Sequence, residues 1–242
     1  MVRRATDDKL RVTVTAPAEL LAVVFTSGRA ATQNSKVREA VARSIDRAAI
    51  VNFILQKQGE ASASLLPQWV SGTAFLFSTA ADPAKARALW TQIASSPALV
   101  LGYDSSEAME QAVAERIAVN AREAGISLTA RAIPAQANGS PFDARVERFR
   151  IASPVARVAF AELVPAIAPA LGGDVAAVAS DATPSDIFAE EREILGTYRV
   201  IPVVQVPRIY GVGSRVRNWE IRAGDSLAGW QLADLWVEGE AP

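Results

Sequence analysis

The chain has 242 residues, half of them apolar, and its 25 basic and 26 acidic side chains give a formal net charge of −1. This length allows a large buried core, while the balanced charge without a basic run provides no electrostatic footprint for nucleic acid or for a membrane surface. Cysteine and histidine are both absent, which excludes disulfides, thiol nucleophiles, Ser-His-Asp relays and the common zinc sites, so we predict no metal site, no cofactor and no nucleic-acid partner.

Two strands are predicted near the start of the chain. Residues 10–14 alternate apolar and polar side chains, the pattern of a half-buried strand. After Pro17, residues 20–25 form a continuous apolar run that suits a strand buried on both faces. Pro17 is therefore expected to separate the two strands.

The segment 34–59 predicts two helices joined at Asp46. Its first half carries apolar residues at three- and four-residue steps, which is one stripe of a helix facing a core. Asn34 or Ser35 can cap this first helix, and Asp46 can cap the second. Gly59 is expected to end the second helix in the left-handed conformation that helix ends favour.

A strand, a helix and a second strand are predicted after residue 82. Asp82 and Pro83 first open a short helix, as cap and first helical residue. Residues 98–103 then form a strand, a helix runs from about 107 to 124, and residues 126–133 form the next strand. A strand, helix and strand of this length predict a parallel, right-handed βαβ unit.

The turn Asp104-Ser105-Ser106 stands where the first strand of this unit ends and its helix begins. In open α/β sheets ligands bind at that edge, and the free N–H groups of a helix start suit a carboxylate. The alternative interpretation is that Asp104 and Ser105 act only as helix caps. Further along, we predict a strand at 146–151.

Two helices complete the prediction from the residues alone. One helix starts at Ser153-Pro154 and reaches Pro169, and another covers 184–198.

Five short stretches of the chain resemble a known family, in the same order. They are Val37-Arg38-Glu39-Ala40, Ser44-Ile45-Asp46-Arg47, Ile50-Val51, Gly59-Glu60 and Leu66-Pro67. Together they are similar to the second lobe of bacterial extracytoplasmic solute-binding proteins, the family that serves peptide and nickel ABC importers. The resemblance covers nearly the whole chain but only a C-terminal part of the family's fold. It also implies separate strands at 199–205, 208–211 and 216–219.

This resemblance implies the fold class and the domain organisation. The fold class is α/β, a periplasmic-binding-protein-like lobe with a mixed, partly parallel central sheet flanked by helices. Residues 1–242 are expected to form a single domain that corresponds to the second lobe plus the C-terminal strands, with the first lobe absent. The start of the chain has no apolar segment typical of a signal peptide, so we interpret it as an excised lobe.

The resemblance also implies a function. The chain is expected to bind a solute, peptide-like in character, which hinge closure holds between this lobe and the missing first lobe. The closed form would dock on an ABC importer permease, in a periplasmic or extracytoplasmic location, and no enzymatic activity is expected. An alternative is a small α/β enzyme that uses carboxylates, for example Asp104 with Glu107 or Asp143. A further alternative is that the fold serves a chaperone or sensory role.

Relatives of this family hold the ends of a peptide with charged residues, and this chain departs from that pattern. No arginine lies between Tyr103 and Gln111, where relatives place one for a ligand carboxylate, and residues 150–154 contain no aspartate for a ligand amino group. This departure counts against an ordinary dipeptide. Trp69 is a candidate cleft wall, although packing alone would also explain it. The predicted ligand-binding residues are Trp69, Tyr103, Asp104, Ser105, Ser106 and Tyr210.

Overall fold

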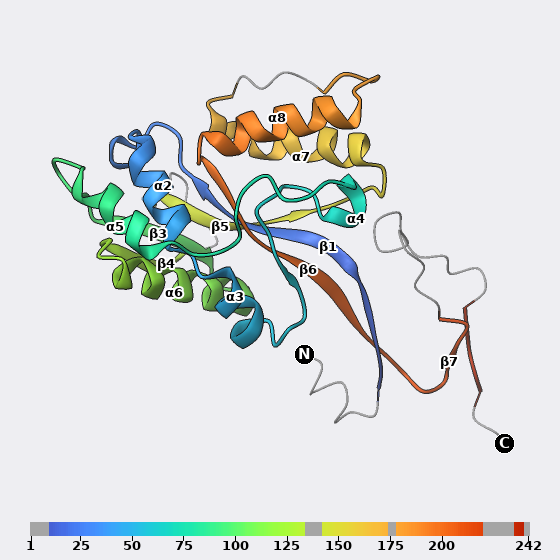
Figure 1. Cartoon of the computed structure of the whole chain (residues 1–242). Helices are drawn as coiled ribbons and strands as arrows, with labels where there is room; N and C mark the ends of the chain where they lie inside the picture. The colour runs from blue at the N-terminus through green and yellow to red at the C-terminus, as the bar shows by residue number, and fades with distance from the viewer. Residues whose placement is uncertain (1–9, 134–141, 174–177, 220–234, 240–242) are drawn as a thin grey trace.

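The structure, a computed structural model, describes residues 10–133, 142–173, 178–219 and 235–239. A six-stranded mixed sheet in the order β2-β6-β1-β5-β3-β4 forms its centre, with helices on both faces (Figure 1). The strands are β1 (Arg11–Phe25), β2 (Glu60–Ala61), β3 (Leu99–Asp104), β4 (Leu128–Ile133), β5 (Ala144–Arg150) and β6 (Val200–Val212), and β7 (Val216–Arg217) pairs separately with β8 (Trp236–Val237).

The helices divide between the two faces of the sheet, which confirms the predicted α/β class. Helices α2, α5 and α6 cover one face together with the short α3, and α7 and α8 cover the other with α4. The helices are α2 (Ser35–Ser44), α3 (Arg47–Ala49), α4 (Gln68–Ser71), α5 (Pro83–Thr91), α6 (Ala108–Glu123), α7 (Ala156–Leu171) and α8 (Pro184–Gly196), besides a 3₁₀ turn η1 (Ala30–Thr32) and a π turn η2 (Ile50–Ile54).

Strand β1 lies in the middle of the sheet, antiparallel to β5 on one side and to β6 on the other. Leu21, Val23 and Phe25 are buried under α2 and α6, whereas the alternate residues face α7 and α8. The prediction of a strand buried on both faces is confirmed. The predicted break near Pro17 is wrong, because register shifts on either side of Pro17 absorb it within one 15-residue strand.

The two helices predicted at 34–59 form with the predicted caps. Asn34 accepts a hydrogen bond from the Lys36 N–H, and Asp46 accepts one from the Ala49 N–H, both at 2.9 Å. The second helix is shorter than predicted, since α3 passes after one turn into η2.

The predicted role of Gly59 is also corrected. Gln56 and Lys57 take the left-handed conformation after η2, whereas Gly59 has φ +154°. A Cβ atom on Gly59 would lie 2.9 Å from the backbone oxygen of Gln205, so glycine is required there by the close approach of β6.

The predicted βαβ unit is confirmed. Strands β3 and β4 are parallel in register from Leu99 opposite Leu128 to Asp104 opposite Ile133, with α6 as the crossover. The segments predicted as separate strands at 199–205 and 208–211 form the single strand β6. In the described part of the chain, no helix is both long and apolar enough to span a membrane.

Helix α8 is tied to the loop before α4 by the buried carboxylate of Glu191, which is only 3% exposed. This carboxylate accepts hydrogen bonds from the backbone N–H groups of Leu65 and Leu66. Burial raises the pKa of Glu191 to about 7, although the two N–H groups partly oppose this shift. The folded state therefore favours the protonated carboxyl.

Glu191→Gln is expected to stabilise the protein at pH 8 relative to pH 5. The pKa of Glu191 is raised in the folded state, so its contribution to stability is complete below about pH 4.5 and is lost as the pH rises through about 7. A neutral amide removes that loss. Urea unfolding measures the free energy of unfolding of the variant minus that of the wild type. This difference should be on the order of 2 kcal/mol more positive, meaning more stabilising, at pH 8 than at pH 5.

Glu193→Gln is the matched control, because Glu193 lies on the same helix with an exposed side chain. Its effect should stay within about 0.5 kcal/mol at both pH values. A Glu191→Gln effect that does not change with pH would contradict the assigned protonation state.

Candidate functional site

Charged side chains from four neighbouring segments meet at the edge of the sheet where β3 and β5 end. Arg148 comes from β5, Glu19 from β1 and Arg208 from β6, while Glu107 and Glu110 stand at the start of α6. The topology explains this meeting. Strand β1 lies between β5 and β6 and is antiparallel to both, so Glu19 has Arg148 on one side and Arg208 on the other. Strand β5 runs parallel to β3, so both strands end near the start of α6. We call these five residues the edge network.

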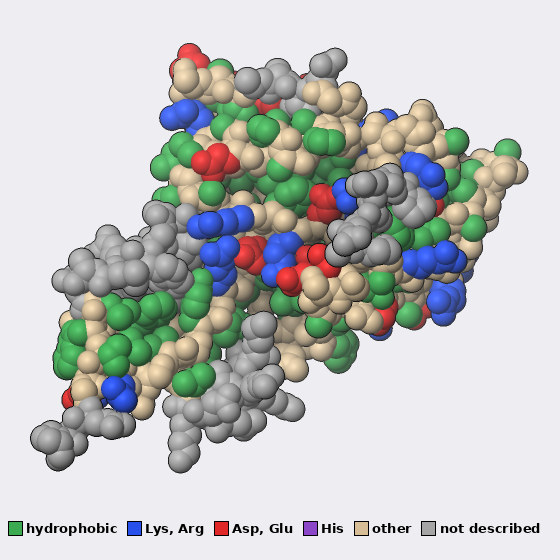
Figure 2. Space-filling model, turned by 180° about the vertical axis from the view of Figure 1, so that it is seen from behind, with side chains coloured by type: hydrophobic (Ala, Val, Ile, Leu, Met, Phe, Trp, Pro, Cys, Tyr) green, Lys and Arg blue, Asp and Glu red, His purple; other side chains and the backbone are tan. Residues whose placement is uncertain are grey.

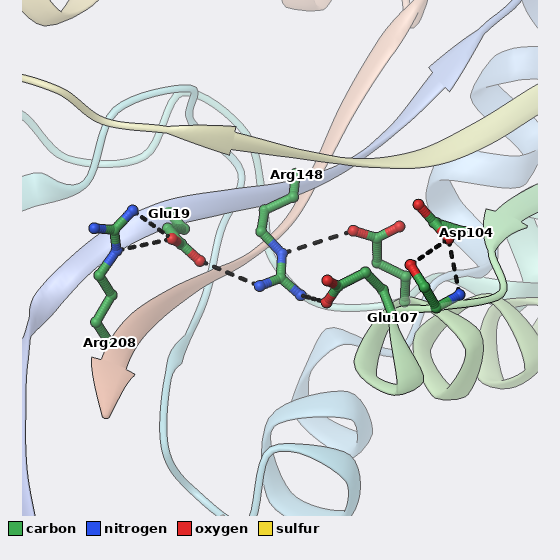
Figure 3. Close-up of polar contacts among 7 residues, drawn as sticks. Glu19, Asp104, Glu107, Arg148 and Arg208 are labelled. Carbon is green, nitrogen blue, oxygen red and sulfur yellow. Dashed lines mark hydrogen bonds and ion pairs between the residues drawn. The ribbon is translucent and has the colours of Figure 1, made fainter. Parts of the chain in front are cut away.

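The edge network is a chain of ion pairs (Figure 3). Glu19 Oε1 lies 2.9 Å from Arg208 Nε and 2.8 Å from Arg208 Nη2, and Glu19 Oε2 lies 3.4 Å from Arg148 Nη1. Arg148 Nη2 donates to Glu107 Oε2 at 3.1 Å, and Arg148 Nε lies 3.6 Å from Glu110 Oε1. Figure 2 shows charged side chains of both signs gathered across the middle of this face. Arg148 thus connects three carboxylates.

The environments of the two α6 glutamates differ. Glu110 is buried, and this burial raises its pKa, while the charge of Arg148 lowers it in part. Glu107 has a side chain that is 47% exposed and pairs with Arg148 at the surface. Within the network, therefore, the carboxylate of Glu110 is buried and that of Glu107 is exposed to solvent.

The predicted turn Asp104 to Ser106 lies beside the edge network, but it is organised differently from the prediction. Asp104 Oδ1 accepts from the Ser106 N–H at 2.8 Å and from the Ser106 hydroxyl at 2.7 Å, and these bonds lower the pKa of Asp104. The interpretation of Asp104 and Ser105 as helix caps is wrong, because the N-cap position of α6 is Glu107 and no side chain caps it. Ser105 lies exposed in this turn.

The three aromatic candidates lie in different surroundings. Trp69, on α4, is 36% exposed and its indole N–H donates to the Pro17 oxygen at 2.9 Å, which places it beside β1. Tyr210, on β6, is opposite Thr13 of β1, beyond the point where β5 ends. Tyr103 is partly buried against the core on the α6 side. A role in ligand binding stays a prediction for all three.

Arg148 is the residue that sequence reasoning missed. The chain has no arginine in the turn before α6, yet β5 brings Arg148 to the start of that helix. A signal existed in the sequence, since Glu147, Arg148 and Arg150 are three charges within the strand predicted at 146–151, and charges on a central strand require partners. The residues 150–154 still contain no aspartate, so that departure from the family's peptide-binding pattern remains.

Of the carboxylate pairs in the enzyme alternative, Asp104 and Asp143 lie at opposite ends of β3. Asp143 accepts from the Val100 N–H at 2.9 Å near the beginning of β3, whereas Asp104 ends this strand. Four residues of strand correspond to about 13 Å. The carboxylate of Glu107 forms an ion pair with Arg148. Among the described residues, no group of three or more acidic side chains is placed to hold a metal ion.

Comparison with known families identifies the chain. Residues 3–156 match the model described as bacterial extracellular solute-binding proteins, family 5 Middle. The chain belongs to this family. A comparison with curated protein sequences found no match. The membership confirms the resemblance carried by the segment 37–67.

Solved structures share the fold of this family 5 chain. NikA from Brucella suis in complex with Fe(III)-EDTA superposes with a TM-score of 0.76 at 17% identity, covering 98% of this chain and 54% of NikA. The murein tripeptide-binding protein MppA from Escherichia coli gives 0.76 at 14% identity, covering 94% and 50%. The oligopeptide-binding protein AppA from Bacillus subtilis, in complex with a nonapeptide, gives 0.71 at 13% identity, covering 97% and 55%. The chain thus spans about half the length of these structures.

Removing the charge of Arg148 is expected to destabilise the fold. In Arg148→Gln the buried Glu110 loses its cationic partner, and the expected cost is roughly 2 kcal/mol at pH 8 after allowance for solvent screening. The cost should be smaller at pH 5 than at pH 8, because burial raises the pKa of Glu110 and removal of the Arg148 charge raises it further, which favours the neutral carboxyl at the lower pH. Chemical denaturation at the two pH values measures this difference.

Glu107→Gln serves as the control, because an exposed ion pair contributes about 1 kcal/mol or less. The double variant Arg148→Gln/Glu110→Gln should recover most of the lost stability. If the double variant is as unstable at pH 8 as Arg148→Gln, the pairing of Arg148 with Glu110 is not what stabilises this edge.

Proposed function

We propose that this chain is the ligand-binding second lobe of an ABC-importer solute-binding protein, and that it closes on a peptide-like solute together with a first lobe. Two observations together carry the proposal: the family 5 membership, and the position of the edge network beside a two-stranded ribbon formed by residues 11–14 of β1 and 209–212 of β6. The matched structures are about twice as long as this chain, which agrees with a ligand site completed by another lobe.

The ribbon supports hinge closure. Residues 11–14 of β1 pair with residues 209–212 of β6 beyond the last contact with β5, which is Glu19 opposite Arg150 (Figure 1). Two antiparallel strands that leave a lobe together form a connection that can bend without unfolding the core. A ligand that contacts both lobes then favours the closed form, because it interacts more strongly with that form than with the open one.

The solute class is proposed from the matched structures together with the charges of this edge. AppA is in complex with a nonapeptide, MppA is a murein tripeptide-binding protein, and NikA is in complex with Fe(III)-EDTA. In this chain, Glu19, Glu107 and Glu110 share the guanidinium groups of Arg148 and Arg208, and the carboxylate of Asp104 lies in the turn beside them, bonded to Ser106. The excess of carboxylates favours a ligand that brings a cationic group to the start of α6.

The six predicted residues fit this proposal as surroundings of the ligand. Asp104, Ser105 and Ser106 lie at the sheet edge, and Trp69 and Tyr210 lie along the β1 and β6 strands that lead away from it. Tyr103 precedes the turn. The structure adds Glu107, whose carboxylate is exposed, to this set of proposed ligand-binding residues. We further propose a periplasmic or extracytoplasmic location and docking on an importer permease, in line with the family's description as extracellular solute-binding proteins.

A thermal-shift screen tests this proposal. The gene product that contains both lobes and the 242-residue chain are each screened against short peptides, oligosaccharides and nickel chelates. A ligand that binds the folded state raises the melting temperature by mass action. We expect a cationic peptide to stabilise the two-lobed protein, and to stabilise the isolated chain far less.

Glu107→Gln in the two-lobed protein should reduce this stabilisation, while the distant Glu193→Gln should leave it unchanged. An equally strong response of the isolated chain would show that the ligand site lies wholly within these 242 residues. The absence of any response to peptides, with a response to another class, would reject the peptide-like assignment.

A further inference from the structure

A cavity of about 280 Å³ lies away from the edge network, at the beginning of β6. It is lined by Val200, Ile201 and Pro202 together with residues from α2, α3, the end of α8 and the loop before α5. Pro202 and Arg208 are six residues apart on one strand, which corresponds to about 20 Å. None of the six predicted ligand residues and none of the edge network lines this cavity.

The unusual feature of the cavity is the side chain of Arg47. Arg47 is 5% exposed, and its Nε donates to the Pro202 oxygen at 3.0 Å. Its two terminal nitrogens make no hydrogen bond, and its guanidinium makes no ion pair, with any residue in the described ranges. Burial lowers the pKa of Arg47 to about 10, with no nearby charge to oppose it. The guanidinium is charged at neutral pH and lies at a cavity wall.

The rest of the lining gives the cavity a positive and largely apolar character, with the hydroxyls of Ser78 and Tyr198 as uncharged polar groups. Arg43 also lines it, but this side chain is already paired with Glu39 at 2.7 Å. No aspartate or glutamate is among the lining residues. Leu76, Phe77 and Leu195 provide apolar walls in addition to Val200 and Ile201.

We propose that this cavity is a second binding site, which takes a small organic carboxylate with an apolar or aromatic body. The two terminal nitrogens of Arg47 present parallel N–H donors that match the two oxygens of a carboxylate. A partner of opposite charge offsets the cost of keeping the cation out of water. The apolar walls accommodate the body of the ligand, and the volume sets its size at that of benzoate or a short-chain fatty acid.

Benzoate is the probe, and benzamide is its uncharged counterpart of nearly the same shape. Amide chemical shifts of the 242-residue chain are followed by NMR during titration with each compound at pH 7. We expect benzoate to shift signals of residues around Arg47, Phe77 and Val200, with a dissociation constant at least about tenfold lower than that of benzamide. Equal affinities, or shifts elsewhere in the chain, would overturn the proposal.

Three variants locate the binding. Arg47→Gln removes the charge and should abolish the preference for benzoate. Ala80→Trp adds bulk at an exposed position of the cavity lining, and it should block both compounds even if Arg47→Gln fails to fold. Arg122→Gln removes an exposed arginine of α6 that does not line the cavity, and it should leave benzoate affinity unchanged. Benzoate binding that persists in Ala80→Trp, or that is lost in Arg122→Gln, would place the carboxylate outside this cavity. Because this site is independent of the solute cleft, its failure would leave the proposed function untouched.

Discussion

The pairing of β1 with β6 is the constraint on which the rest of this structure depends. These strands come from opposite ends of the chain, yet they pair antiparallel from Arg11 opposite Val212 to Val24 opposite Val200. At one end the pair forms the ribbon and carries Glu19 and Arg208 to the sheet edge. At the other end the start of β6 forms the wall of the cavity. Because side chains alternate along β1, the same strand also separates the two cores under the helical layers.

Three buried or partly buried arginines show how the fold accommodates cations. Arg38 donates only to backbone oxygens, those of Thr32, Gln33 and Thr197, and so fixes α2 against the end of α8. Arg148 is neutralised by carboxylates of the edge network. Among the described residues, Arg47 donates to one backbone oxygen, that of Pro202, and its guanidinium lines the cavity. Buried charges are costly unless they are paired, so Arg47 is the one of the three whose surroundings favour an added anion.

Family membership and ligand choice rest on different parts of the molecule. The match to family 5 covers residues 3–156, a range that includes the segment 37–67 and the βαβ unit. Those residues determine packing, which the matched structures share at identities of only 13–17%. The proposed ligand site, in contrast, lies at the sheet edge, where β5 brings Arg148 to the start of α6 and residues 150–154 contain no aspartate. A fold can persist while its site changes.

The sequence by itself determined the elements whose signals are local. The caps at Asn34, Asp46 and Asp82, the βαβ unit and the two-sided burial of residues 20–25 follow from hydrogen-bonding groups and apolar spacing within a few residues of one another. Only the tertiary structure decided the continuity of β1 through Pro17, because a neighbouring strand must supply the register shift. It alone brought Arg148 to α6 and left Arg47 facing a cavity, since pairing between strands distant in sequence places those charges.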